Sequence, residues 1–385
     1  MLQSVLIFAI SAMFLGLGLG RFAFSPLIPE LVGNGWLEVG AAQTVGAANL
    51  VGYLVGALLA KPALRLTSER TLCVLSGALV FLSYDLLILP FGVGWFWIMR
   101  FLAGAGGALL MVVATAAAGR HLAALDRKQF QPMVFMGIGL GALFAAICLP
   151  QVLIYGIELS IVALMLFSGV ALAALWWSSG FLHQNIAPPP SSDRPVSRVG
   201  WSVSLILLAY GCDALGSVMH TVYLPDMLRR AYGHTEEQVG LSWAMFGIGA
   251  CFGPLFVVLL RRFMSVSNAL WIAFALKAFG VALILAATDP LTAGLSLFIV
   301  GMLTPGIVIL TSGALSAAAP PDRYLALWAV GTAFFALCQM MSGMFTATTS
   351  AQGYGTALLL SVIILGMGAV LAITSKHFLH QEGLR

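Results

Sequence analysis

Long apolar runs separated by short polar segments make up most of this chain. A helix needs about 20 apolar residues to cross the hydrocarbon core of a membrane, and each run is long enough to do so. Reading the runs against the charged residues, prolines and glycines between them predicts twelve helices, over residues 3–28, 39–60, 71–90, 95–118, 132–154, 158–181, 201–224, 239–260, 268–288, 292–317, 324–346 and 355–375. The pattern indicates an all-α integral membrane protein with twelve transmembrane helices.

One polar stretch interrupts this pattern near the middle of the chain. Residues 183–200, HQNIAPPPSSDRPVSRVG, are rich in Pro and Ser and have no hydrophobic periodicity. We interpret them as a cytoplasmic linker. It would join an N-terminal six-helix bundle over residues 1–182 to a C-terminal six-helix bundle over residues 201–385.

The two predicted bundles repeat each other. LIPEL at residues 27–31 matches YLPDML at residues 223–228, and a glycine series follows each of them in one register, with an offset of about 200 residues. Two six-helix halves in the same orientation, related by an axis along the membrane normal, form one of the known transporter architectures. We therefore predict pseudo-symmetric halves with a substrate site between them.

Composition and charge agree with a membrane protein and indicate its orientation. Hydrophobic residues are 61% of the chain, charged residues are 8%, and the mean hydropathy is +1.01. Of the 18 Lys and Arg residues, three lie within spans and two, Arg229 and Arg230, lie in loops opposite the termini, which leaves thirteen on the side of the termini. Because cations collect on the cytoplasmic side, both termini are predicted to be cytoplasmic, and the net charge of +4 needs no nucleic-acid partner.

Reactive motifs are absent from the sequence. The five cysteines lie singly in apolar runs, which is typical of free buried thiols and not of a metal site or a disulfide framework. The six histidines are scattered, and neither HExxH nor GxSxG nor a phosphate-binding GxxxxGK loop occurs. We expect no enzyme activity, no cofactor and no metal. No Lys or Arg precedes Arg21 and the first apolar run is too long for a signal peptide, so we also expect no cleavage.

Three basic residues lie inside predicted spans, where a charge costs a few kcal/mol. Arg21 in LGLGRFAFSPLIPE and Arg100 both fall in the outer part of the bilayer, whereas Lys277 lies near its middle. A guanidinium fork binds carboxylate or phosphate with two hydrogen bonds, so Arg21 and Arg100 together indicate an organic-anion site. In the alternative, each arginine pairs with backbone carbonyls or a buried acid and pins helices together. For Lys277 we favour a structural, partner-satisfied or snorkelling lysine.

Asp213, near the middle of the seventh helix, is the candidate for proton coupling. A carboxylate there can be neutralised, and its balance with a nearby cation would let a proton and a substrate compete. The alternative is a permanent salt bridge to Arg21 or Arg100. His220 would relay protons or lie at a helix interface. Asp85 lies toward the outer end of the third helix, and the helix-end acids are expected to be solvated: Glu30, Asp226 and Glu158.

Neutral polar residues in the predicted helices add further candidates for substrate binding. We single out Asn49, Tyr53 and Gln339, which could donate hydrogen bonds to a substrate. The alternative for each is a hydrogen bond between helices, worth about 0.6 kcal/mol on average.

Three stretches resemble the major facilitator superfamily, and more narrowly its YbfB/YjiJ group of bacterial permeases. They are GLGRFAFSPLIPEL from Gly18, RFLAGAGG from Arg100 and QMMSG from Gln339. The loop from Gly56, GALLAKPALRLTSER, departs from the superfamily pattern because Ala60 stands where an acid belongs. The resemblance implies the major facilitator fold, the bacterial inner membrane and a substrate path that opens to each side in turn.

These features lead to a functional hypothesis. We predict a monomeric secondary active transporter that moves a small organic solute, anionic or carboxylate-bearing, by proton-coupled alternating access. Arg21 and Arg100 would hold the anion and Asp213 the proton. Its partners would be the small-molecule substrate, protons and the lipid bilayer. The alternative is proton-antiport efflux of hydrophobic or cationic compounds, in which Asp213 contacts the substrate and the arginines are structural.

Overall fold

A computed structural model describes the chain except residues 90, 184–199, 319–320, 350–353 and 382–385, and it leaves out the side chains of residues 150, 321–326, 349 and 379–381. The described part contains helices and no strands. The first half comprises α1 (Leu2–Met13), η1 (Phe14–Ala23), α2 (Leu27–Gly33), α3 (Val39–Leu66), α4 (Glu69–Asp85), η2 (Leu86–Ile88), α5 (Val93–Ala124), η3 (Lys128–Phe135), α6 (Met136–Leu153), α7 (Ile157–Ser178) and η4 (Ser179–His183). The second half comprises α8 (Trp201–Val218), η5 (Met219–Tyr223), α9 (Leu224–Arg230), α10 (Glu236–Phe263), α11 (Val266–Ala286), α12 (Pro290–Ala318), α13 (Pro321–Thr349) and α14 (Gly355–Gln381).

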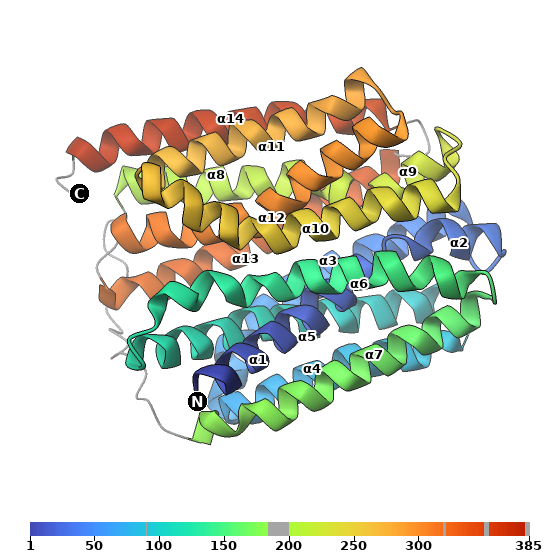
Figure 1. The fold of residues 1–385 in the computed structure, drawn as a ribbon, viewed down its shortest axis with the longest axis horizontal. Coiled ribbons are helices and arrows are strands. Elements are labelled where there is room, and N and C mark those ends of the chain that lie inside the picture. The colour runs from blue at the N-terminus through green and yellow to red at the C-terminus, as the bar shows by residue number, and fades with distance from the viewer. Residues whose placement is uncertain (90, 184–199, 319–320, 350–353, 382–385) are drawn as a thin grey trace.

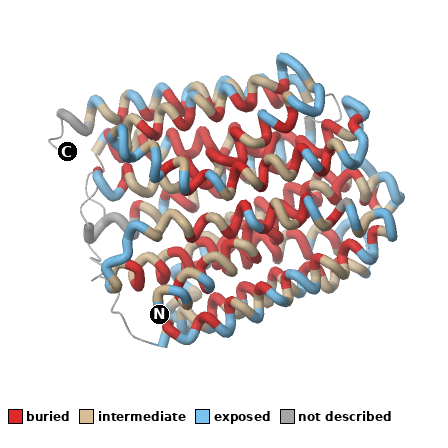
Figure 2. The backbone as a smooth tube through the Cα atoms, in the orientation of Figure 1, coloured by how far each residue is buried: buried red, intermediate tan, exposed pale blue. Residues whose placement is uncertain are grey.

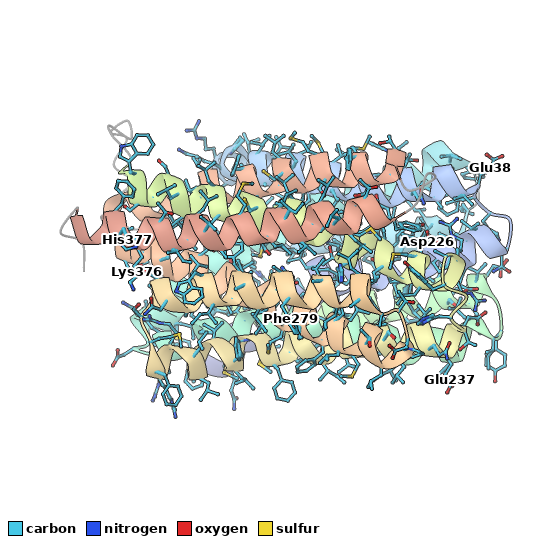
Figure 3. The ribbon with its side chains drawn as sticks, turned by 90° about the horizontal axis from the view of Figure 1, so that it is seen from above. Glu38, Asp226, Glu237, Phe279, Lys376 and His377 are labelled. Atoms are coloured by element: carbon cyan, nitrogen blue, oxygen red, sulfur yellow. The ribbon has the colours of Figure 1, made fainter. Side chains whose placement is uncertain are left out.

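Twelve segments among the described residues are long and apolar enough to cross a membrane, which confirms the predicted number of spans. They lie roughly parallel, and both termini are at one end of the bundle (Figure 1). We call the opposite end the outer end. Lys376 and His377 lie near the end that holds the termini, and Glu38, Asp226 and Glu237 lie at the outer end (Figure 3). Phe279 lies between the two ends. Buried residues concentrate inside the bundle (Figure 2). Exposed apolar side chains such as Phe279 are suited to contact lipid.

The first span of each half is longer than predicted. The first was expected to end at residue 28 but continues to Gly33, and the seventh was expected to end at residue 224 but continues to Arg230. In both spans a π-helical segment, η1 or η5, precedes the proline-containing turn. Because Pro29 and Pro225 then fall within the first turn of a new helix, their missing N–H groups do not break the span.

Glycines allow the helices to pack closely in equivalent places of both halves. A Cβ at Gly52 of α3 would overlap the carbonyl oxygen of Phe101 in α5, and a Cβ at Gly253 of α10 would overlap the carbonyl oxygen of Met302 in α12. The contact of α3 with α5 therefore recurs as the contact of α10 with α12. Shared packing at repeat positions supports the prediction of two similar halves.

Two pairs of helices make the most extensive contacts between the halves. α3 packs against α13, and α6 packs against α10. At the second contact a Cβ on Gly247 would overlap the backbone of Leu143, so the two helices touch through their main chains. The predicted linker, residues 183–200, lies outside the described residues except for His183 and Gly200.

Candidate functional site

Arg21 reaches across the boundary between the two halves. Its Nη1 donates to Oε1 of Gln339 in α13 at 2.8 Å, and its Nη2 donates to Oγ1 of Thr221 in η5 at 3.4 Å. The residue is 6% exposed, and its Nε has no hydrogen-bond acceptor among the described residues. The guanidinium is thus buried with neutral oxygens as its hydrogen-bond partners. The structure joins two predicted site residues, Arg21 and Gln339, and adds Thr221, which the sequence analysis missed.

The repeat explains why Thr221 lies beside Arg21. Oγ of Ser25 donates to the carbonyl oxygen of Thr221 at 3.0 Å, and these two residues are 196 positions apart. Pro29 and Pro225 have the same separation (225 − 29 = 196). Equivalent residues of the two halves therefore meet at this point, as they do where a pseudo-two-fold axis passes between related segments. The repeat register contained this signal, because it pairs Ser25 with Thr221.

Arg100 is held within the first half. Its Nη2 donates to the carbonyl oxygen of Gly20 at 2.8 Å, and its guanidinium carbon lies 4.1 Å from the ring centroid of Phe24. The guanidinium carbon also lies 5.9 Å from the ring centroid of Tyr84. The Tyr84 hydroxyl in turn donates to the carbonyl oxygen of Leu19 at 2.6 Å. This arrangement matches the alternative in which the arginine pairs with a backbone carbonyl. No motif in the sequence indicated Tyr84.

Asn49 supports the same region of backbone. Its Nδ2 donates to the carbonyl oxygens of Gly20 at 3.1 Å and Arg100 at 3.2 Å, so it bridges the first, second and fourth spans. Its Oδ1 is buried and has no donor among the described residues. Tyr53, one turn further along α3, is buried and lies within electrostatic range of Arg21. Asn49 therefore touches the backbone beside Arg21, and Tyr53 lies near the guanidinium itself.

Asp213 forms an ion pair that the sequence analysis did not predict. Lys277 Nζ of α11 donates to Oδ1 of Asp213 in α8 at 2.6 Å, and both side chains are buried. The alternative of a salt bridge to Arg21 or Arg100 is therefore wrong, because the position that a guanidinium would take is filled by Lys277. Lys277 has the partner that its interpretation as a partner-satisfied lysine expects. Asp213 nevertheless remains within electrostatic range of Arg21.

His220 lies at a helix interface, as one of its two interpretations requires. Its Nε2 is 3.1 Å from Oγ of Ser296 in α12, and that hydroxyl donates to the carbonyl oxygen of Gly280 in α11 at 2.7 Å. The chain of contacts links three helices of the second half. His220 is fully buried, and its Nδ1 has no partner among the described residues.

A polar cluster at the outer end connects the halves a second time. We call Asp226, Arg230, Tyr354 and Gln43 the outer cluster. Arg230 donates to both carboxylate oxygens of Asp226, the Tyr354 hydroxyl donates to Oδ2 of Asp226 at 2.6 Å, and Nε2 of Gln43 donates to the Tyr354 hydroxyl at 3.3 Å. Burial and the adjacent Asp226 carboxylate raise the pKa of Tyr354 above its ordinary value. The expectation that Asp226 is solvated was wrong, because the loop residue Tyr354 covers it and leaves it fully buried.

A pocket opens between the halves near this end. Its walls include Pro26 and Pro29 of the first span, Leu149 and Leu153 of α6, and the Arg229–Glu236 ion pair of 2.8 Å. Glu30 also lines it and is half-buried. Of the other acids, Asp85 is half-buried and Glu158 is exposed. The pocket thus lies along the first span, a short distance outside Arg21.

The arrangement holds a buried cation, Arg21, at the boundary of the halves with no ion-pair partner among the described residues, and the Asp213–Lys277 ion pair lies within electrostatic range of it. Among the described residues, no group of three His, Cys, Asp or Glu side chains is placed to hold a metal ion. The comparisons with known proteins bear on what such an arrangement does. A family model described as "Uncharacterised MFS-type transporter YbfB" matches residues 13–375 of the chain. A comparison with curated proteins finds no match.

Proposed function

Because this chain belongs to the family of MFS-type transporters described by YbfB, we propose that it moves a small organic anion across the membrane by proton-coupled alternating access. MFS denotes the major facilitator superfamily. Membership makes the chain a multi-pass membrane transporter of a small molecule, a function that is not enzymatic. The solute class, the coupling ion and the moving parts are what we add.

The buried charge of Arg21 carries the proposal. A guanidinium inside a membrane protein is stable only if something compensates it, and here its hydrogen bonds go to the neutral oxygens of Gln339 and Thr221. A carboxylate or phosphate fits the fork of an arginine and would supply the missing negative charge. Tyr53 and Gln339 are the neutral groups that would bind the same anion.

Arg100 serves the same site indirectly in this proposal. Its hydrogen bond to the Gly20 carbonyl, together with those of Asn49, fixes the backbone of the residue before Arg21. The wide turns of η1 leave that backbone without an ordinary α-helical pattern, so side chains take over part of its support. Arg100 and Asn49 are therefore positioning residues for Arg21.

The proton is assigned to Asp213. The carboxylate faces Lys277 at 2.6 Å on one side and lies within electrostatic range of Arg21. Protonation would remove its negative charge, leave Lys277 without its ion-pair partner and make the surroundings of Arg21 more positive, which favours entry of an anion. Proton and anion then bind with positive coupling, as symport requires. The alternative, efflux of cationic compounds, needs an Asp213 that contacts the substrate, and Lys277 occupies that carboxylate.

The way the halves are joined supports alternating access. Hydrogen bonds link Arg21 to Gln339, Ser25 to Thr221 and Gln43 to Tyr354, and they span from the site to the outer end. We propose that bundles 1–182 and 201–385 rock about this region, with residues 183–200 as the linker. We also propose a monomer in the bacterial inner membrane with cytoplasmic termini, which the thirteen cations on that side support.

Anion binding to purified protein tests the proposal. We would measure dissociation constants for acetate, benzoate and inorganic phosphate by thermal stabilisation of wild type and Arg21→Gln. Loss of two charge-assisted hydrogen bonds is expected to weaken the preferred anion by about 100-fold. Arg65→Gln, at an exposed arginine, is the matched control and should leave the constant unchanged. Equal affinity in Arg21→Gln and wild type would contradict the proposal.

A further inference from the structure

Aromatic side chains adjoin the guanidinium of Arg21 in an unbroken series. The guanidinium carbon lies 5.3 Å from the ring centroid of Phe22, and the ring of Phe22 lies 5.1 Å from that of Phe246 in α10. The ring of Phe246 stacks on Trp243 with a centroid distance of 4.7 Å and an interplanar angle of 6°. We call Phe22, Phe246 and Trp243 the ring series. It begins at the proposed anion ligand and ends one helical turn further out on the other half.

The last member of the series has an unsatisfied polar group. Trp243 is 0% exposed, and its indole N–H has no acceptor among the described residues. Buried indole N–H groups usually find a partner, because leaving a donor unpaired loses its hydrogen bonds to water. The Nε of Arg21 is buried and unpaired as well. Two buried donors without acceptors among the described residues thus lie at the two ends of the ring series, the Nε–H of Arg21 beside Phe22 and the indole N–H of Trp243.

With the contact between Phe22 and Phe246 open, a ligand with a carboxylate and a polar ring would satisfy both donors. We infer that the solute is an aromatic carboxylate, whose carboxylate binds Arg21, whose ring stacks in the ring series, and whose ring oxygen accepts from the Trp243 indole. This inference rests on the proposed function, since it names the class of anion for the same site. Aromatic faces prefer offset or edge contacts with other rings, which a saturated ring of the same size cannot make with the same geometry.

The position of the series adds a reason to place a substrate there. Phe22 belongs to the first half, whereas Phe246 and Trp243 belong to the second, so the contact between Phe22 and Phe246 crosses the boundary. A ring inserted at that contact would touch both moving bundles at once. Small ligands that touch two bodies couple their motion, which is what a transported solute must do.

Four charge-matched probes test the inference: 4-hydroxybenzoate, benzoate, cyclohexanecarboxylate and acetate. Calorimetric titration of purified wild type should give benzoate an affinity about fivefold higher than cyclohexanecarboxylate, from the ring contacts. The hydroxyl of 4-hydroxybenzoate should add a further increase, because a site that donates to a substrate oxygen discriminates against analogues that lack it. Acetate should bind most weakly.

Two variants locate the effect. Trp243→Phe keeps an aromatic ring and removes the N–H, so it should weaken 4-hydroxybenzoate about tenfold more than it weakens benzoate. Trp177→Phe makes the same change at a tryptophan that is 73% exposed and should alter neither affinity. Melting temperatures of both variants close to wild type would show that folding is intact.

The outcomes separate this inference from the proposed function. Equal affinities for benzoate and cyclohexanecarboxylate, both lost in Arg21→Gln, would overturn the aromatic class and leave the anion site standing. Binding of phosphate with no binding of the carboxylates would do the same. Carboxylate affinities that ignore Arg21→Gln would overturn both claims. An unchanged 4-hydroxybenzoate constant in Trp243→Phe would overturn the role of the indole N–H.

Discussion

The first spans of the two halves, Leu2–Gly33 and Trp201–Arg230, have the same backbone plan but carry buried charges of opposite sign. Each contains a π-helical segment followed by a proline turn. The first carries Arg21, whose hydrogen-bond partners are neutral and belong to the other half. The second carries Asp213, whose partner Lys277 is charged and belongs to its own half. Arg21 thus depends on the boundary between the halves, whereas Asp213 is balanced within one of them.

This difference indicates how two halves with the same backbone plan can carry different buried charges. The position equivalent to Arg21 in the second half is Ser217, which carries no charge (21 + 196 = 217). What the repeat preserves is the wide helix turn, the proline and the contact between Ser25 and Thr221. Arg21 and Asp213 each lie in only one half, so the groups that we propose for substrate and proton lie on different halves.

The largest expected effect concerns the compensated pair. Asp213→Asn or Lys277→Met leaves one buried charge without its partner, which should destabilise the fold by about 3–5 kcal/mol. Asp213→Asn combined with Lys277→Met removes both charges and should recover most of that loss. Thermal unfolding in detergent checks the three variants. Additive losses in the double variant would show that the two side chains do not act as a pair.

A smaller loss is expected at Arg100. Arg100→Gln removes the hydrogen bond to the Gly20 carbonyl and the contact with the Phe24 ring, at a cost of about 2 kcal/mol. Arg21→Gln should cost less stability, because it removes a buried charge that nothing neutralises. The same unfolding measurement compares them. If Arg21→Gln were the more damaging variant, Arg21 and not Arg100 would be the structural arginine.

The outer cluster should respond to the loss of one hydroxyl. Tyr354→Phe removes the bonds that connect Asp226 to Gln43, worth about 1 kcal/mol, so the outer side should open about fivefold more often. Thiol labelling of Ser25→Cys from the outer side, in a chain with its five native cysteines replaced, reports the opening. Tyr232→Phe, at an exposed tyrosine, is the control. A labelling rate unchanged by Tyr354→Phe would show that the outer cluster does not hold the outer side closed.

The smallest effect is a titration. Burial, and then the hydrogen bond and charge of Asp226, raise the pKa of Tyr354 above 10.0, so its neutral form belongs to the folded state. A raised pKa means that the stabilisation by this tyrosine is complete below pH 10 and is lost as the pH rises further. Ultraviolet difference titration of wild type against Tyr354→Phe would show one tyrosine ionising above its ordinary range. In Asp226→Asn the rise should shrink but persist, since burial is its first cause.

Much of the fold could be predicted because it depends on patterns along one helix at a time. Apolar length gave the twelve spans, and the repeated LIPEL and YLPDML segments gave the two halves. The ends of the first and seventh spans were placed too early because Pro29 and Pro225 were read as stops. Whether a proline ends a helix depends on the turn before it, and a π-helical turn has no distinct sequence pattern.

The partners of the charges were harder to predict, because depth in the membrane gives no direction around a helix. Arg21 and Arg100 lie at similar depth, yet one faces the other half and the other faces Gly20. Asp213 and Lys277 both lay near the middle of their helices, and that shared depth was the signal that could have joined them. Asp226 resembled an exposed helix-end acid until the loop residue Tyr354 was placed over it.

The pH dependence of anion affinity tests most directly the claim that a fixed cation on one half is coupled to a neutralisable pair on the other. Benzoate would be titrated into wild type, and into the Asp213→Asn and Lys277→Met combination, at several pH values. The account predicts that wild-type affinity rises about tenfold as the pH falls and Asp213 takes up a proton. The paired variant should bind benzoate with no such rise. A wild-type affinity independent of pH, or an equal rise in both proteins, would contradict the account.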